Sequence, residues 1–338
     1  MAFVLLLVVV AVAAFLMTAW LRRYALAKSL LDIPNGRSSH AMPTPRGGGL
    51  AVVIGFLLAL PVLQGFGGGS NELLWALLGA GGWVALVGFL DDHRHVPARW
   101  RLLAHFTGAA WALICLGGLP PLTVWIELDL GWAGHVLAMF YLVWLVNLFN
   151  FMDGIDGIAG IEVVTVCTGA SVLFHAGGDS AGWAEPAVLA ASTMGFLAWN
   201  FPKAKIFMGD AGSGFLGMIV GIFSIHAAWI RPELFWGWII LLGVFIIDAT
   251  VTLLRRVANG ERFYEAHRSH AYQHASRLYA DHTKVSLAVG TINLLWLLPI
   301  AILVTKLRWD PLIGLLVAYA PLLWLAFRFN AGKKEQQA

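Results

Sequence analysis

Long apolar runs separated by short polar segments make up almost the entire chain. A helix needs about 20 mostly apolar residues to cross a membrane. The pattern predicts about eleven transmembrane helices, at residues 3–21, 47–66, 73–90, 102–119, 133–150, 158–176, 185–201, 211–230, 234–255, 285–305 and 310–329. No polar segment is long enough to fold by itself. We therefore expect an all-α, polytopic membrane protein with one integral-membrane domain over residues 1–338.

Composition supports the membrane class. Of the 338 residues, 59% are hydrophobic and 12% are charged, and this charged fraction is about half that of an average soluble protein. Cys115 and Cys167 lie inside apolar runs and form neither a metal motif nor a disulfide framework. The first apolar run has no basic segment before it and ends at Arg22 and Arg23. We expect a retained span there rather than a cleaved signal peptide.

Lysine and arginine predict the orientation, because they concentrate in cytoplasmic loops. Of the 22 such residues, only Arg231, Lys306 and Arg308 fall on one side of the predicted spans. The others lie on the opposite side, with the C-terminus. We therefore expect a periplasmic N-terminus, a cytoplasmic C-terminus and cytoplasmic catalytic loops. The same asymmetry explains a pI near 9.0 without any binding of nucleic acid.

A stretch from Asn147 to Ala159 joins two apolar runs and carries polar side chains at every third position. These are Asn147, Asn150, Asp153 and Asp156. A three-residue step falls about 60° short of a helical turn, so the four cannot share one face of a helix. Gly154 and Gly157 indicate where the helix stops. We expect the two asparagines on its last turns, Asp153 at its mouth and Asp156 opening the next helix. This arrangement places carboxylates at a membrane surface, where metal or phosphate chemistry can occur.

A pair of acids, Asp91 and Asp92, ends the third predicted span. They could be a solvated helix end. However, acids at a helix C-terminus oppose the helix dipole. Two adjacent ones need compensation by Arg94 or by a divalent cation.

A glycine-rich segment, residues 207–214, contains Asp210 and precedes the eighth span. Glycines at the start of a helix let backbone N–H groups approach a phosphate. The segment could also be a flexible turn. With Lys203 and Lys205 beside it, we favour a site for a metal and a diphosphate. Three glycines directly after Arg46 form a second opening of this kind.

Asp248 lies inside the ninth span, two helical turns before Arg255, so both fall on one face. An acid within a membrane span usually faces a cavity or a partner. A structural ion pair is as good an explanation as a functional site. Glu162, one turn into the sixth span, could likewise have a structural or a functional role.

Three histidines, His267, His270 and His274, follow the ninth span at helical spacing. They could bind zinc, but neither a cysteine nor an acid completes such a site. Arg262 and Arg268 add positive charge. We therefore favour a cationic loop that binds phosphate.

Taken together, these segments resemble the polyprenyl-phosphate N-acetylhexosamine-1-phosphate transferases, the MraY/WecA type of glycosyltransferase family 4. The residues that carry the resemblance are Asp32–Gly49, Asp91–Asp92, Asn147–Ala159, Lys205–Gly214, Asp248 with Arg255 and Arg256, and His267–Gln273. They span most of the chain in the family's order. The last segment is similar to the WbpL-like branch, which initiates O-antigen synthesis, more than to the branch that makes lipid I. One departure is His95, where the family often has a third acid.

The resemblance implies a reaction. An enzyme of this kind transfers N-acetylhexosamine-1-phosphate, of the GlcNAc or the FucNAc/QuiNAc type, from a UDP-sugar to undecaprenyl phosphate and releases UMP. It requires Mg²⁺, with Mn²⁺ able to substitute. It resides in the bacterial inner membrane, and a homodimer is compatible with the family. The sugar and the glycan pathway stay open.

The resemblance also implies roles for individual residues. Asp210 would be the principal metal ligand, with Asp92, and Asp91 or Asp92 would hold or deprotonate the lipid phosphate. Asp153 and Asp156 would complete the catalytic acids. Substrate-binding residues would be Asn147, Asn150, Lys205, His267, Arg268, His270, Arg37, Arg46 and Asp248.

A secondary transporter with a carboxylate relay through Asp248 and Glu162 is the alternative from another class. Transporters place polar groups near the bilayer midplane and often have inverted repeats. Here the acids gather at one surface and no repeat is visible. The pattern therefore favours the enzyme.

Overall fold

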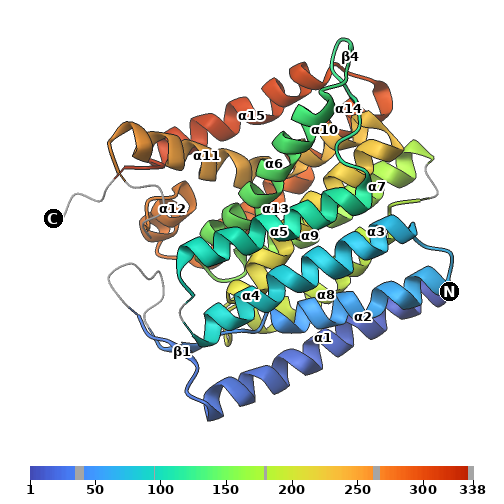
Figure 1. Cartoon of the computed structure of the whole chain (residues 1–338). Coiled ribbons are helices and arrows are strands. Elements are labelled where there is room, and N and C mark those ends of the chain that lie inside the picture. Colours follow the sequence, from blue (N-terminus) through green and yellow to red (C-terminus); the bar gives the residue numbers. More distant parts are fainter. Residues whose placement is uncertain (35–41, 95, 179–180, 262–266, 334–338) are drawn as a thin grey trace.

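The computed structural model describes residues 1–34, 42–94, 96–178, 181–261 and 267–333. Arg37, His95 and Arg262 lie outside the described residues. Helices run along a common direction to form one bundle (Figure 1). One end of the bundle carries α12 and the hairpin of β1 and β2. The other end carries the N-terminus and the hairpin of β3 and β4.

The secondary structure is almost entirely helical. The helices are α1 (Ala2–Ala27), α2 (Leu50–Gly65), α3 (Asn71–Ala76), α4 (Gly82–His93), α5 (Ala98–Leu116), α6 (Gly131–Met152), α7 (Ile158–Gly177), α8 (Ala184–Asn200), α9 (Asp210–Ile230), α10 (Pro232–Leu241), α11 (Gly243–Ala258), α12 (Ala271–Tyr279), α13 (His282–Ile292), α14 (Leu298–Leu307) and α15 (Pro311–Arg328). Two π-helical turns, η1 (Leu77–Gly81) and η2 (Asn293–Leu297), join α3 to α4 and α13 to α14. Every predicted span coincides with a helix or with a chain of such helices.

The number of spans is smaller when judged by length and composition. Among the described residues, seven helical segments are long and apolar enough to cross a membrane, and α10 with α11 would make an eighth as one bent span. The predicted spans left over are α2, α5 and α8. α2 and α8 are short, with 16 and 17 residues, and α5 begins with Arg99 and Arg101 in its first turn. The polytopic all-α fold is confirmed, whereas the count of eleven stays a prediction.

The predicted span 234–255 is not a straight helix. α10 and α11 are bent by 68° at Leu242. α11 therefore leaves the direction of α10 and packs against α15 and α6. This bend matters for the site, because cavities lie on both sides of α11.

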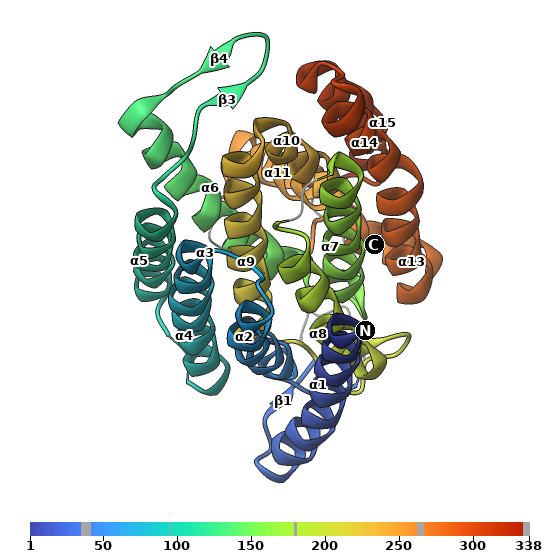
Figure 2. The same cartoon turned by 90° about the vertical axis from the view of Figure 1, so that its right-hand side faces the viewer.

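α9 is the centre of the bundle. Its most apolar window is 83% buried, the highest value of any membrane-spanning candidate. It packs against α6, α4 and α10 and lies among the other helices in the rotated view (Figure 2). Glycines allow this packing: a Cβ at Gly217 would collide with the backbone of α6 at Leu145. A residue at the start of α9 is therefore held in place from several sides.

The two glycine-rich openings predicted from the sequence lie side by side. β1 (Leu31–Asp32) and β2 (Thr44–Pro45) form an antiparallel pair, and the chain after β2 continues along residues 207–208. Gly48 N–H donates to the carbonyl of Phe207 at 2.9 Å, and Gly49 N–H donates to that of Met208 at 2.8 Å. This pairing brings Arg46 next to the start of α9. A second hairpin, β3 (Leu122–Thr123) with β4 (Glu127–Leu128), lies at the opposite end.

Candidate active site

The end of α4 and the start of α9 meet through Asp92. Its carboxylate accepts hydrogen bonds from the backbone N–H groups of Asp210 and Ala211, at 3.1 and 3.2 Å. Asp92 is only 5% exposed. Such N–H groups have no partner inside their own helix. Asp92 therefore caps α9 from another helix and fixes the position of Asp210.

Gly209 makes this contact possible. Its φ of +78° favours glycine, and a Cβ there would lie 2.6 Å from Oδ2 of Asp92. Any side chain at this position would push α4 and α9 apart. The glycine-rich segment thus positions two acids relative to each other.

Arg101 joins the other member of the acid pair to Asp210. Its Nη1 lies 2.6 Å from Oδ2 of Asp91 and 3.3 Å from Oδ2 of Asp210. Asp91 also accepts a hydrogen bond from the backbone N–H of Val96 at 2.7 Å. The three side chains come from α4, α5 and α9. They gather two carboxylates and one guanidinium in a single cluster.

From the sequence, Arg94 or a divalent cation was the expected compensating charge for the acid pair. The side chain of Arg94 is exposed, and Arg101 pairs with Asp91 instead. The sequence does contain a signal for this ion pair, because Arg101 lies at the start of the next span, one short loop after the acid pair. Arg46 also reaches the pair, where its Nη2 donates to the backbone carbonyl of Asp92 at 2.5 Å.

The donor set suits Mg²⁺ bound in part by substrate. Mg²⁺ usually takes one or two protein carboxylates and completes its shell with water and phosphate oxygens. Asp210 keeps 35% of its side chain exposed, against 7% for Asp91, so Asp210 can offer an oxygen to an ion. Both oxygens of Asp92 already accept backbone hydrogen bonds. Among the described residues no three His, Cys, Asp or Glu side chains form a closed metal cage.

The stretch from Asn147 to Ala159 folds largely as predicted. Asn147 and Asn150 lie on the last turns of α6, and Asp153 is the residue that ends it. The hydroxyl of Ser213, on α9, donates to Oδ1 of Asn150 at 2.5 Å. This bond attaches α6 to the first turns of α9, whereas Asn147 donates to the carbonyl of Val143 within α6 at 2.7 Å.

Asp156 lies in the turn before α7 and does not itself open that helix, because Gly157 adopts a φ of +76° and α7 begins at Ile158. Its Oδ2 lies 3.3 Å from Nδ1 of His282 on α13. Ser286, one turn further along α13, donates to the backbone carbonyl of Asp156 at 2.7 Å. Asp156 is thus directed toward α13.

Asp153 has no side-chain hydrogen bond within the part of the chain that the structure describes. Burial, together with the negative charges of Asp92 and Asp156, raises the pKa of Asp153 to about 7. A carboxyl in this condition is stabilised in its ionised form by any cation that enters the site. A metal ion or a cationic group that enters the site would therefore lower the pKa of Asp153 and keep this carboxyl ionised.

Asp248 organises the loop before α12. Its Oδ1 accepts from the backbone N–H of Ala271 at 2.9 Å and contacts Nδ1 of His270 at 3.2 Å. Its Oδ2 accepts from the N–H of Tyr272 at 2.9 Å. Asp248 thus caps α12 and holds His270. Within the described residues Arg255 makes no ion pair with Asp248, and its guanidinium donates to the carbonyl of Ala331 at 2.7 Å. The ion pair that was one of two explanations for Asp248 is therefore formed with His270 and not with Arg255.

The histidine loop presents an unused nitrogen. His270 is 2% exposed, and its Nε2 is buried without a hydrogen-bond partner among the described residues. Its ring stacks on that of His267, with centroids 4.9 Å apart. His274 instead contacts Nη2 of Arg277 at 3.2 Å. Arg268 lies in the same loop, where its backbone carbonyl accepts from Arg277 at 3.1 Å.

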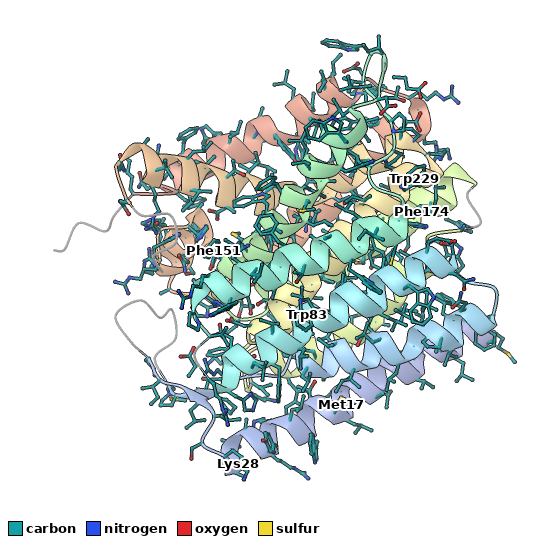
Figure 3. The ribbon with its side chains drawn as sticks, in the orientation of Figure 1. Met17, Lys28, Trp83, Phe151, Phe174 and Trp229 are labelled. Carbon is teal, nitrogen blue, oxygen red and sulfur yellow. The ribbon has the colours of Figure 1, made fainter. Side chains whose placement is uncertain are left out.

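The histidine loop lies against the end of α6. The hydroxyl of Tyr272 donates to the carbonyl of Phe151 at 2.9 Å, and Figure 3 labels Phe151 beside α12. The ring of His267 lies 6.0 Å from that of Phe151, centroid to centroid. The histidine loop and the Asn147–Ala159 stretch are therefore one connected surface.

Lys205, which was expected to bind substrate, lies away from the acid cluster. Its Nζ lies 5.4 Å from the centroid of the Trp199 ring, and its backbone carbonyl accepts from Nε of Arg22 at 3.2 Å. It is exposed at the surface. These contacts do not bring it to the acid cluster.

Asn200 is a buried residue that the sequence analysis missed. Its Oδ1 accepts from the N–H of Gly157 at 2.9 Å, and its Nδ2 donates to the carbonyl of Ile206 at 2.9 Å. One amide thereby links the turn after Asp156 to the segment before Asp210. An asparagine at the end of an apolar helix carries no sequence signal that distinguishes this role from a solvated helix end.

A cavity of about 530 Å³ opens beside the acid cluster. Its lining comes from α4, α5, α6, α9 and α11. One part is polar and includes Arg101, Asn147, Asn150 and Asp210, and the rest is mainly apolar, with Phe106, Phe140, Trp144 and Leu253. A ligand that fits this lining has a polar group and a hydrocarbon part.

Comparison with known proteins places the chain in a family. The sequence pattern of Glycosyl transferase family 4 matches residues 74–228. The probable undecaprenyl-phosphate N-acetylglucosaminyl 1-phosphate transferase of Bacillus subtilis is 30% identical over 303 residues, which cover 87% of this chain and 83% of that protein. The chain belongs to glycosyl transferase family 4.

Other relatives agree with this membership. The decaprenyl-phosphate N-acetylglucosaminephosphotransferase of Mycolicibacterium smegmatis is 28% identical over 82% of this chain and 76% of its own length. The phospho-N-acetylmuramoyl-pentapeptide-transferase of Heliobacterium modesticaldum is 31% identical over 71% and 76%. The relatives thus include transferases named for N-acetylglucosamine and one named for phospho-N-acetylmuramoyl-pentapeptide. The matched residues 74–228 contain Asp91, Asp92, Asp153, Asp156 and Asp210.

Proposed function

We propose that this protein transfers an N-acetylhexosamine-1-phosphate from a UDP-sugar to undecaprenyl phosphate and releases UMP. Membership in glycosyl transferase family 4 supports the reaction class. The observation that carries the proposal is the cluster of Asp91, Arg101 and Asp210 at the polar part of a mainly apolar cavity. A lipid phosphate needs this combination, because its isoprenoid chain is apolar and its head is an anion.

The acceptor would lie in the 530 Å³ cavity. Its chain would contact Phe106, Phe140 and Trp144, and its phosphate would reach Arg101. A guanidinium forms strong, directional hydrogen bonds with phosphate oxygens. Arg101 would then exchange part of its contact with the carboxylates for a contact with substrate.

Asp210, with Asp91 beside it, would hold Mg²⁺ together with the donor diphosphate. When bound, the ion neutralises charge on the diphosphate and on the departing UMP. Asp92 would act mainly by placing Asp210, because its oxygens hold the first turn of α9. Phosphoryl transfer depends chiefly on such positioning and charge neutralisation.

The donor diphosphate would approach the histidine loop. Nε2 of His270 lacks a partner, and Asp248 fixes Nδ1 on the opposite side of the ring. A protonated His270 would donate Nε2–H to a phosphate oxygen, with Arg268 adding charge from the same loop. Asp153 and Asp156 would border the nucleotide from the end of α6.

The lipid phosphate would attack the β-phosphorus of the donor directly. The second pKa of a phosphomonoester is about 6, so the attacking oxygen is largely ionised at neutral pH. A strong general base is therefore unnecessary. A covalent route through a carboxylate would give ping-pong kinetics and would release UMP without the lipid.

The names of two relatives suggest which sugar the donor carries. The Bacillus and Mycolicibacterium relatives are named for N-acetylglucosamine, so UDP-GlcNAc is the first donor to test, followed by UDP-FucNAc and UDP-QuiNAc. We assign the protein to the initiating step of O-antigen or related cell-envelope glycan synthesis in the bacterial inner membrane. The His267–Gln273 segment supports this branch.

The transporter alternative has no comparable support. Glu162 accepts a hydrogen bond from Asn293 at 2.7 Å, and Asp248 is occupied by α12. The deciding experiment supplies purified protein in detergent with undecaprenyl phosphate, Mg²⁺ and a panel of labelled UDP-sugars. Label should move into the lipid fraction for one or more donors, with UMP released in equal amount. A transporter would give no lipid-linked label with any of them.

A further inference from the structure

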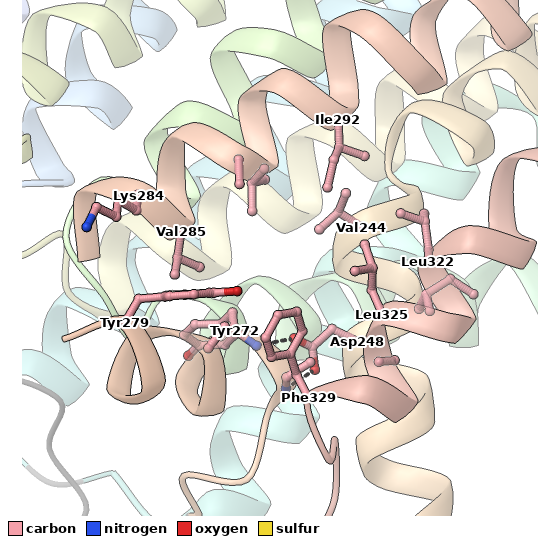
Figure 4. Close-up of a pocket in the computed structure, with 16 residues that line it drawn as sticks. Val244, Asp248, Tyr272, Tyr279, Lys284, Val285, Ile292, Leu322, Leu325 and Phe329 are labelled. Atoms are coloured by element: carbon pink, nitrogen blue, oxygen red, sulfur yellow. Dashed lines mark hydrogen bonds between the residues drawn. The ribbon is translucent and has the colours of Figure 1, made fainter. Parts of the chain in front are cut away.

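A second cavity, of about 350 Å³, lies on the other side of α11 from the acid cluster. Figure 4 shows its walls, which come from α11, α12, α13 and α15. The walls are mainly apolar, with Val244, Ile292, Leu322 and Leu325 among the lining side chains. Asp210 and Arg101 line only the first cavity, so the two spaces are distinct.

The buried polar groups on this lining are already satisfied. The two oxygens of Asp248 accept hydrogen bonds from Thr252, Ala271 and Tyr272. The hydroxyl of Tyr272 donates to the carbonyl of Phe151. Among the described lining residues, the hydroxyl of Tyr279 makes no hydrogen bond and points into the cavity (Figure 4), while the rest of the interior is apolar or already bonded. A ligand that enters must bury hydrocarbon.

The cavity follows the first turns of a membrane-spanning candidate. His282–Leu307 is one of the seven apolar segments, and Val285, Val289 and Ile292 on it line the cavity. Val285 and Ile292 are two helical turns apart, which is about 10 Å along the axis. The space thus extends from the start of α13 along the axis of this span. It has the depth for part of a hydrocarbon chain.

The mouth carries an exposed basic side chain. Lys284, on the first turn of α13, has 69% of its side chain exposed, and its Nζ lies 3.6 Å from Oδ2 of Asp281. An exposed ion pair of this kind contributes little, so the ammonium can also bind an anion. Tyr279 lies on the same rim and is 52% exposed. Figure 4 places Lys284 at the edge of the cavity, away from Val244 and Leu322.

We propose that this cavity binds one acyl chain of an anionic phospholipid, with the lipid phosphate beside Lys284. The apolar lining selects the chain, and the lysine at its mouth selects the charge. The polyprenyl acceptor does not fit this position, because its phosphate must reach Asp210 on the far side of α11. Lipid binding here depends on the membrane setting of α13, and only the choice of a phospholipid over the polyprenyl acceptor rests on the proposed function.

Photolabelling in vesicles tests the site. The full chain is reconstituted in phosphatidylcholine with a minor fraction of phosphatidylglycerol that carries a diazirine near the end of one acyl chain. After illumination, labelled residues are mapped by mass spectrometry. Label should concentrate on α11, α13 and α15 around Val244, Ile292 and Leu322. Unlabelled phosphatidylglycerol should compete for it more strongly than unlabelled phosphatidylcholine.

Matched variants separate the cavity from the general lipid surface. Ala288 lines the cavity and is exposed within it, so Ala288→Trp should fill the space and remove most of the label. Leu287→Trp is the control, because Leu287 is 52% exposed but does not line the cavity. Lys284→Gln should lower the preference for phosphatidylglycerol about fivefold, as expected for one basic residue at an anionic surface. Lys28→Gln, at the end of α1, should leave it unchanged.

Three results would overturn the proposal. Label that spreads evenly over the outer faces of the helices in the wild-type protein would mean that the cavity holds no lipid chain. Equal competition by the two phospholipids would remove the charge selection. Stronger competition by undecaprenyl phosphate than by phosphatidylglycerol would assign the cavity to the acceptor instead. Each result comes from the wild-type protein, so the conclusion holds even if Ala288→Trp misfolds.

Discussion

The carboxylate of Asp92 accepts a hydrogen bond from the backbone N–H of Asp210 at 3.1 Å, so the end of α4 determines where α9 begins. Two acids that look alike in the sequence therefore have different surroundings. Asp92 is buried and bound to the main chain, whereas Asp210 keeps a third of its side chain exposed.

Asp92→Ala should lower both stability and activity. Removing a side chain that caps a helix N-terminus costs about 1–2 kcal/mol, and here Asp210 would lose its fixed position as well. Asp210→Asn should abolish most activity and leave the thermal midpoint in detergent nearly unchanged. Unfolding followed by tryptophan fluorescence, together with the transfer assay, compares the two. If Asp92→Ala is as stable as the wild type yet inactive, Asp92 acts in the chemistry rather than as a cap.

Arg101→Ala should reduce turnover by roughly 10²-fold, the usual effect of losing one donor that stabilises developing charge. Arg101 is the cation that contacts both Asp91 and Asp210. Arg99→Ala is the matched control, because Arg99 lies on the first turn of the same helix and its guanidinium lies 5.7 Å from the ring centroid of Trp100. Initial rates with both substrates saturating measure the effect. Equal losses in the two variants would point to a general effect of charge near the membrane.

Asp153→Asn should stabilise the empty protein in a pH-dependent way. The pKa of Asp153 is raised from 3.8 to about 7 by burial and by Asp92 and Asp156. The unfolded chain loses this proton first, so the wild type loses stability as pH rises from about 4 to about 7. The asparagine variant lacks this penalty, and its advantage in melting temperature should grow over that interval and then level off. Glu127→Gln, at the exposed hairpin, serves as the control, and an advantage independent of pH would contradict the assignment.

Accessibility to an impermeant thiol reagent tests the predicted orientation. In a background with Cys115 and Cys167 replaced by alanine, Ile126→Cys should react in intact cells, because Ile126 is 70% exposed at the β3–β4 end. Leu278→Cys on α12, where the native side chain is 63% exposed, should react only after the cells are permeabilised. The reverse pattern would invert the topology.

Sequence periodicity was sufficient for the helices and for the placement of Asn147 and Asn150 at a helix end. Asn147 and Asn150 end a helix as expected, because glycines and a polar step of three residues mark that boundary. The pairing of the two glycine-rich openings also brings Arg46 to Asp92. The helix end is a local signal, whereas the approach of Arg46 to Asp92 depends on pairing with residues 207–208, far along the chain.

Long-range partners could not be predicted in the same way. The contact of Arg101 with Asp210 joins residues 109 positions apart, and Asn200 bonds to Gly157 across 43. Asp248 contacts His270, 22 residues away, where α11 packs against α12. Such contacts follow from how helices pack, and the pattern of one helix does not contain that information.

Metal-dependent transfer of labelled GlcNAc-1-phosphate to undecaprenyl phosphate tests the central claim most directly. The wild-type protein should transfer label with Mg²⁺ or Mn²⁺, stop when a chelator is added and resume when the metal is restored. Asp210→Asn should lose most of this turnover while Arg99→Ala keeps it, and neither should release UMP when the lipid is omitted. Transfer that persists in chelator, or undiminished transfer by Asp210→Asn, would contradict the account.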